Sequence, residues 1–195
     1  MIRTPLCDLF GIDVPIINAP MGLSASLELA AAVSNSGGLG LIAMAPRLPT
    51  NIPTVLNQMR ALTPKPFGIN FVLPLDPPER LHQKLQVCLD WGVKIVTLFW
   101  DRPDEYIKQA HRAGALVTYT VGSVSEARDA VAAGADVIVA QGWEAGGHVL
   151  PIVTRKNTLS LGHQFLHNHG RGFDFLHQTD ALTRIESHRF YLALH

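Results

Sequence analysis

GALVTYTVGSVSEARDAVAAGADVIVAQ, residues 114–141, contains a complete strand–helix–strand unit. Two short apolar runs, 116–121 and 137–141, flank an alanine-rich segment. Ser123 and Glu126 have the spacing of a capping box, which opens a helix, and Gly134 stands where a helix would end. Apolar runs without a clear two-residue alternation are typical of parallel strands that are covered on both faces. This stretch therefore predicts two parallel strands joined by a helix.

The same unit repeats through the preceding part of the chain. Short apolar runs alternate with helical segments, and this order is typical of α/β proteins. The expected strands are residues 15–20, 39–45, 67–73, 95–100, 116–121 and 137–141. The expected helices are residues 25–36, 52–62, 77–91, 103–113 and 123–133.

Two architectures fit this order: a doubly wound open sheet and a (β/α)₈ barrel. No GxGxxG follows the first strand and no GxxxxGK[ST] occurs, which disfavours a dinucleotide-binding Rossmann unit and a P-loop protein. The small-residue turns at 112–115 and 132–136 occupy equivalent positions, which suits the regular geometry of a barrel. We therefore expect the α/β fold of an incomplete (β/α)₈ TIM-type barrel with about six parallel strands, followed by an irregular C-terminal tail.

The character of the sequence changes after His148. Residues 151–195 contain six of the nine histidines, and no strand-then-helix unit is recognisable there. We expect residues 1–150 to form the N-terminal part of the barrel and residues 151–195 to form a divergent, poorly ordered tail. His163 and His167 would share one face of a helix, but no acidic or cysteine ligand lies nearby, so no metal site is predicted.

Charge and composition exclude several classes of protein. Lys and Arg total 16 residues and Asp and Glu total 16, so no basic surplus points to a nucleic acid or an anionic membrane. The two cysteines are too few for a disulfide framework and favour a reducing, cytoplasmic location. No apolar stretch is long enough to predict a membrane span, and the N-terminus lacks the apolar core of a secretory signal.

Three segments follow or interrupt strands with residues that could carry chemistry. The first is AQGWEAGGH, residues 140–148, in which Gln141 offers an amide, Gly146 and Gly147 allow close backbone approach, and His148 offers an imidazole suited to proton transfer. An exposed glycine-rich loop is the alternative. The second is NAPMG, residues 18–22, which could support a flat cofactor or form an ordinary turn. The third is Asn70, which must find hydrogen bonds if it is buried in its apolar strand.

These motifs resemble those of the nitronate monooxygenase family, formerly called 2-nitropropane dioxygenases. The resemblance covers roughly residues 4–149 and rests on PIINAPM at 15–21, AAVSNSGGLG at 31–40, FGIN at 67–70 and AQGWEAGGH at 140–148. It implies an FMN-binding barrel that oxidises alkyl nitronates or nitroalkanes with O₂ to carbonyl compounds and nitrite. It also implies His148 as the base and the following flavin-binding positions: Ala19, Pro20, Met21, Asn70, Gln141, Gly146 and Gly147.

The sequence departs from the family pattern after the glycine-rich motif. Val149, Leu150 and Pro151 stand where the family usually has a glycine, and the tail shows no strand followed by a glycine-rich loop for the FMN phosphate. The chain therefore keeps residues for the flavin ring and the base but is expected to lack the phosphate anchor. Two alternatives stay open: a flavin-dependent enoyl-acyl-carrier-protein reductase, which shares the AGGH-type segment, and a non-catalytic truncated isoform.

Overall fold

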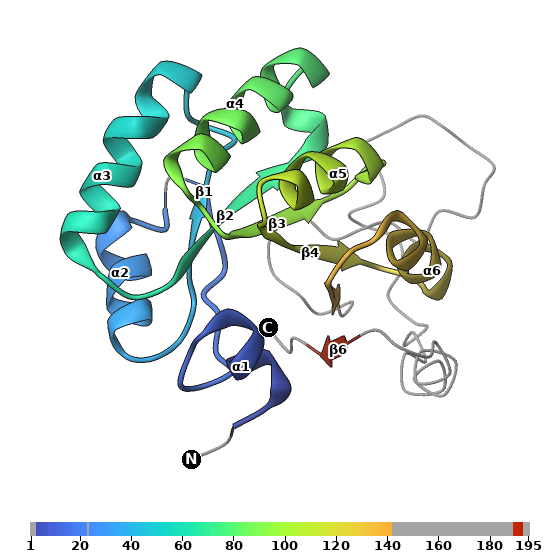
Figure 1. Ribbon diagram of the computed structural model, residues 1–195, viewed down its shortest axis with the longest axis horizontal. Coiled ribbons are helices and arrows are strands. Elements are labelled where there is room, and N and C mark those ends of the chain that lie inside the picture. The colour runs from blue at the N-terminus through green and yellow to red at the C-terminus, as the bar shows by residue number, and fades with distance from the viewer. Residues whose placement is uncertain (1–2, 23, 142–188, 193–195) are drawn as a thin grey trace, which may run out of the picture.

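The computed structural model describes residues 3–22, 24–141 and 189–192 of the 195-residue chain. The strands of this part form one parallel sheet in the order β1-β2-β3-β4-β5-β6, so each strand pairs with its neighbour in sequence (Figure 1). The consecutive, parallel α/β arrangement predicted for the barrel is confirmed. The strands are β1 (Gly40–Ala43), β2 (Phe67–Val72), β3 (Ile95–Phe99), β4 (Leu116–Val121), β5 (Val137–Ala140) and β6 (Arg189–Leu192).

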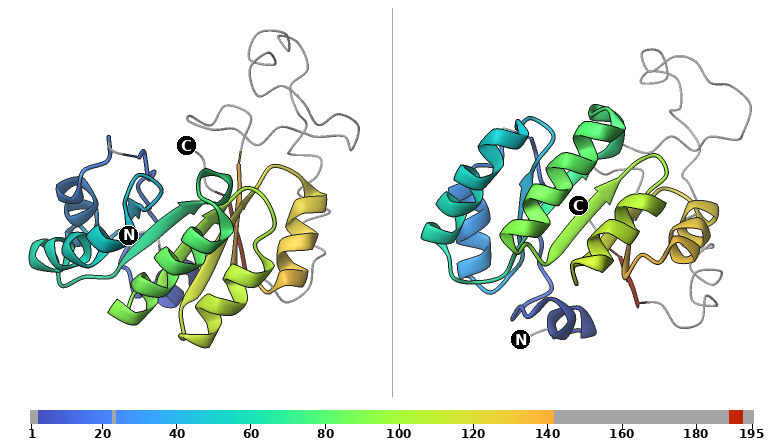
Figure 2. Two further views of the ribbon diagram at one scale, coloured as in Figure 1. Left: turned by 90° about the horizontal axis from the view of Figure 1, so that it is seen from above. Right: turned by 45° about the horizontal axis from the view of Figure 1, so that its top comes forward.

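One side of the sheet is covered by helices that follow the strands in turn (Figure 2). Buried residues of each helix, such as Leu56 and Met59, pack with outward-facing strand residues such as Ile69 and Phe71. These helices are α2 (Leu27–Asn35), α3 (Ile52–Leu62), α4 (Pro78–Trp91), α5 (Asp104–Arg112) and α6 (Val124–Ala133). Short 3₁₀ turns, η1 (Pro49–Asn51) and η2 (Leu73–Leu75), precede α3 and α4.

A further helix, α1 (Pro5–Phe10), covers the N-terminal end of the opposite, inner face. Its buried residues Leu6, Cys7 and Phe10 form a second apolar cluster with inner-face residues of the strands. Those strand-side members are Leu39, Leu41, Ile95 and Val137. The N-terminal end of the inner face is therefore filled by apolar packing, and the C-terminal end is the part left for polar side chains.

Local signals in the sequence set the ends of the helices. The Ser123 hydroxyl accepts a hydrogen bond from the Glu126 backbone N–H (3.2 Å), and the Glu126 carboxylate accepts one from the Gly122 N–H (2.7 Å). The Ser123 cap predicted for α6 is thus confirmed, whereas Glu126 bonds the residue before the cap instead of Ser123 itself. At Gly40, a Cβ would lie 2.0 Å from the Ala30 carbonyl oxygen, so only glycine allows β1 to approach α2 this closely.

The predicted first strand, 15–20, is present only as a single parallel bridge between Ile17 and Leu39. The backbone N–H of Asn18 still donates to the Leu39 carbonyl (3.3 Å), but beyond that point the Asn18 side chain bonds to Leu41. Pro15 and Pro20 bracket the run and carry no N–H, which shortens any ladder they could join. The expected strand was therefore wrong in extent, although the segment lies beside β1 as predicted.

Two elements were not predicted. The six-residue α1 is too short to show a helical period, and it begins at Pro5, where the missing N–H costs nothing. No strand was recognised from the sequence within residues 151–195, yet β6 pairs in parallel with β5 along Val137–Ala140. The unpaired N–H and C=O groups at an open edge of β5 favour such pairing by any chain segment that reaches them.

Candidate flavin site at the C-terminal end of the sheet

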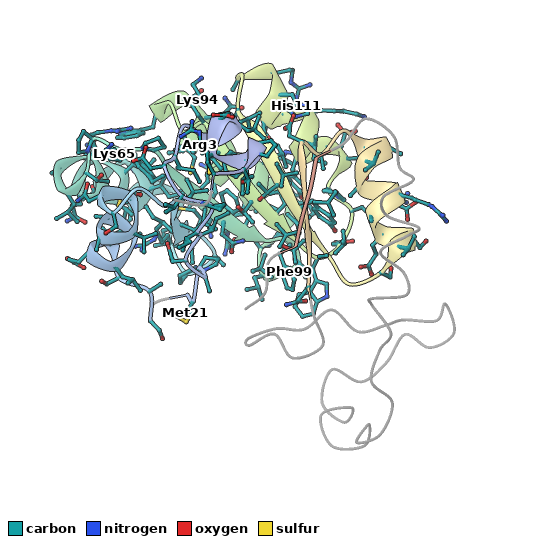
Figure 3. The ribbon with its side chains drawn as sticks, turned by 90° about the horizontal axis from the view of Figure 1, so that it is seen from below. Arg3, Met21, Lys65, Lys94, Phe99 and His111 are labelled. Atoms are coloured by element: carbon teal, nitrogen blue, oxygen red, sulfur yellow. The ribbon has the colours of Figure 1, made fainter. Side chains whose placement is uncertain are left out.

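The predicted site residues that the structure describes gather at the C-terminal ends of the strands. Gln141 directly follows β5, and its backbone N–H donates to the Val121 carbonyl (2.9 Å) at the end of β4. Asn70 lies in the C-terminal half of β2. Met21, with 54% of its surface exposed, lies at the same end as Phe99, opposite Lys94 and His111 (Figure 3). This is the end where barrel enzymes place their active sites.

The inner face carries a polar row at this level. Strand register aligns Ala43, Asn70, Thr97, Thr118 and Val137 side by side, and residues so aligned point to the same face of the sheet. Thr118 and Thr97 are buried, and the Thr118 hydroxyl donates to the Thr97 hydroxyl oxygen (2.8 Å). Two residues closer to the N-terminal end, Leu41, Gly68, Ile95 and Leu116 form the next row on this face, and all of them except Gly68 belong to the apolar cluster with α1.

Asn70 is only 5% exposed, yet its side-chain amide makes no hydrogen bond to another described residue. Every fully buried side-chain nitrogen or oxygen in the described part of the chain has a partner. The Asn70 amide must therefore reach accessible space rather than end inside packed core. A buried amide with both donor and acceptor free suits a ligand that offers both, such as the heteroatom edge of a flavin ring.

Asn18 is a residue of this end whose role the sequence reasoning missed. Its Oδ1 accepts a hydrogen bond from the Leu41 N–H (2.7 Å). Its Nδ2 donates to the carbonyls of Leu41 (3.2 Å) and Ala19 (3.1 Å). The amide thus replaces a backbone ladder on the edge of β1 and fixes the start of the Ala19–Met21 segment. The signal was an asparagine directly before Ala-Pro, a position from which its side chain can bond nearby backbone.

The loops that follow β1 and β2 are joined by a buried ion pair. The Lys84 ammonium group donates to the Asp76 carboxylate (2.7 Å) and to the carbonyls of Ala45 (3.0 Å) and Met44 (3.4 Å). Lys84 and Asp76 are both buried, and Arg80 lies 3.8 Å from the other Asp76 oxygen. Because all three ammonium donors have partners, this pair holds the two loops together at the site end.

The structure describes two of the five remaining predicted site residues. Gly146, Gly147 and His148 fall beyond the described part of the chain. Ala19 and Pro20 are half-buried beside Met21.

A cavity of about 410 Å³ lies at the opposite, N-terminal end, between α1 and the turns that lead into the strands, with Arg60 and Lys94 in its wall. Within the described ranges, no group of three or more His, Cys, Asp or Glu side chains could hold a metal ion.

Comparison with known proteins identifies the family. The family model for nitronate monooxygenase matches residues 3–80 and 79–169, which is most of the chain and extends past the predicted limit near residue 149. The chain belongs to the nitronate monooxygenase family. The nitronate monooxygenase of Paraburkholderia phytofirmans is 34% identical over 182 residues, covering 75% of this chain and 50% of that relative.

Proteins with other names are similar to this chain at about the same level of identity. A dehydrogenase of Mycobacterium tuberculosis that is named for a methyl-oxo-octahydroindene carboxyl-CoA compound is 33% identical over 153 residues, covering 78% of this chain and 42% of that relative. The solved structure of FabK from Thermotoga maritima matches with a TM-score of 0.72 at 36% identity, covering 79% of this chain and 49% of that one. The chain thus spans about half the length of the relatives it matches. None of its described helices is long and apolar enough to cross a membrane.

Proposed function

We propose that this chain forms the flavin-ring end of an FMN site in an enzyme that oxidises alkyl nitronates or nitroalkanes with O₂. The observation that carries the proposal is the Asn70 amide, which is nearly buried at the C-terminal end of the sheet and has no described partner. Membership of the nitronate monooxygenase family supports the choice of flavin and substrate. When bound, FMN would supply the redox chemistry, and the protein would supply binding and proton transfer.

The residues of the chain would divide these tasks. Asn70 and Gln141 would hydrogen-bond the ring, and the backbone of Ala19, Pro20 and Met21 would lie against its face. Gly146 and Gly147 would let the backbone approach the ring closely. His148 would accept the α-proton of a neutral nitroalkane, because an imidazole has a pKa near neutrality and can act as a general base.

The role of His148 can be tested with paired substrates. A neutral nitroalkane must lose its α-proton before oxidation, whereas a preformed nitronate has already lost it. His148→Ala should therefore slow turnover of nitroethane by about 10²–10⁴-fold and leave turnover of ethyl nitronate much less affected. Initial rates of nitrite release on the two substrates provide the measurement. Equal losses on both substrates would rule out a base role.

The reaction class can be tested on the purified chain with added FMN. Nitrite release that requires alkyl nitronate, O₂ and FMN together would support the proposal. Rapid flavin reduction by NADH or NADPH without nitronate would instead favour the enoyl reductase alternative. If neither reaction occurs, the chain is a non-catalytic isoform. The rate is expected to be low, since the tail shows no glycine-rich loop to hold the phosphate of FMN.

A further inference from the structure

The end of β3 brings an aromatic side chain onto the inner face of the sheet. Phe99 is the last residue of β3, and its register partners are Val72 on β2 and Thr120 on β4. Val72 lies two residues after Asn70, so Phe99 belongs to the row directly beyond the Asn70 row, toward the C-terminal end. Phe99 is 8% exposed, but it belongs to neither of the two apolar core clusters formed by the described residues.

Trp100, the next residue, has an unusual backbone conformation. Trp100 (φ 70°) and Asp101 (φ 58°) are the non-glycine residues with positive φ in the described part of the chain. This region is unfavourable for residues with a Cβ, and two in succession are found where the surrounding structure enforces them. Here the Tyr119 hydroxyl donates to the Asp101 carbonyl (2.7 Å) and holds the turn. Burial raises the pKa of Tyr119, so this hydroxyl keeps its proton.

The strained turn changes where the Trp100 ring lies. In an extended strand, consecutive side chains point to opposite faces. The positive φ of Trp100 ends this alternation, and its ring packs beside that of Phe99, with the ring centroids 5.1 Å apart and the planes inclined at 39°. Two consecutive aromatic rings therefore form one surface at the end of the sheet that also holds Met21 (Figure 3).

We propose that the Phe99–Trp100 pair is the apolar wall of the substrate site and contacts the alkyl or aryl group of the nitronate. This inference rests on the proposed function, because it takes a ring held at Asn70 as its reference. Phe99 lies one row beyond Asn70 toward the C-terminal end of the sheet, so a ligand held at Asn70 would have this pair next to it. Large aromatic side chains suit an apolar group, and they limit its length. Residues held in unfavourable backbone conformations cluster at functional sites, so the positive φ angles of Trp100 and Asp101 support this assignment.

The test observes Trp100 itself by ¹⁹F NMR on the chain labelled with 5-fluorotryptophan, in the presence of FMN. The resonance missing from Trp100→Gly identifies Trp100, and Trp91 is the reference because its ring N–H is bound to Asn57 (2.9 Å). Adding 1-nitrohexane should shift the Trp100 resonance more than nitroethane does and leave that of Trp91 in place. An unmoved Trp100 resonance would overturn the proposal. The measurement needs no turnover, and quenching of FMN emission reports flavin binding separately, so a failed wall and a failed function are distinguishable.

Discussion

Asn18 and Asn70 lie on either side of β1, and their side-chain amides have different partners. The Asn18 amide makes three hydrogen bonds to backbone groups, of which two satisfy the N–H and C=O of Leu41. The Asn70 amide, although more buried, makes none to the described residues. A polar side chain that is buried without a protein partner lowers stability and is expected where a ligand supplies the partner. The two asparagines are therefore a matched pair for separating structure from binding.

The substitution of each asparagine by leucine tests this difference. Asn18→Leu leaves two groups of Leu41 without partners and should lower the free energy of unfolding by about 1–3 kcal/mol. Asn70→Leu removes no hydrogen bond within the described chain and should leave stability unchanged within about 0.5 kcal/mol or increase it. Urea unfolding followed by circular dichroism gives both values. A large loss of stability in Asn70→Leu would mean that the amide has a structural partner.

Cys88 provides a pH-dependent test of the core beneath α4. Burial raises the pKa of this thiol from 9.0 to about 12, and the nearby charge of Lys84 opposes the shift. Above pH 9 the unfolded thiol ionises while the folded thiol stays protonated, so Cys88 makes the protein lose stability as pH rises toward 12. Between about pH 8 and about pH 10.5, wild type should lose about 2 kcal/mol more than Cys88→Ala. Parallel pH profiles of the two proteins, from urea unfolding, would contradict the burial of this thiol.

At the scale of elements, α4 links the loops at the candidate site. Lys84 reaches from α4 to the carbonyls that follow β1 and to Asp76, which precedes the helix. Because the ion pair is buried, removing one partner leaves an uncompensated charge in the core. The link therefore contributes to the shape of the loops around the site as well as to stability.

Lys84→Met should lower the free energy of unfolding by about 3–5 kcal/mol, because Asp76 is left buried and unpaired. The matched control is Lys108→Met, which removes an exposed ion pair with Glu105 (2.8 Å) and should cost less than about 1 kcal/mol. Chemical denaturation of both variants under the same conditions provides the comparison. Equal costs would show that the Lys84–Asp76 pair is hydrated rather than buried.

How well each element could be predicted follows from how local its causes are. The strands β1 to β5 and helices α2 to α6 follow from apolar runs, caps and glycine stops that can be read along the chain. Three features depend on tertiary structure: the side-chain pairing of Asn18, the pairing of β6 with the edge of β5, and the docking of α1. At the site, Asn70 was recognisable as a polar residue in an apolar strand. The left-handed turn at Trp100 was not, because tryptophan rarely adopts it.

On the scale of the whole molecule, the two ends of the sheet differ. The N-terminal end of the inner face is packed by α1 (Figure 1), and the C-terminal end carries Asn70, the Phe99–Trp100 pair and the position of Gln141. This division places the proposed ring-binding groups at the end where barrel enzymes carry their active sites.

The central claim is that this chain holds the ring of a flavin, at Asn70, more than its phosphate. Titration of FMN and of riboflavin into the purified 195-residue chain, followed by flavin fluorescence, tests it most directly. We expect both flavins to bind weakly and with affinities within about tenfold of each other, because a phosphate site with three charge-assisted hydrogen bonds would add several orders of magnitude. Asn70→Leu should weaken both about equally. Tight, stoichiometric FMN binding at about micromolar concentration, or binding unchanged by Asn70→Leu, would contradict the account.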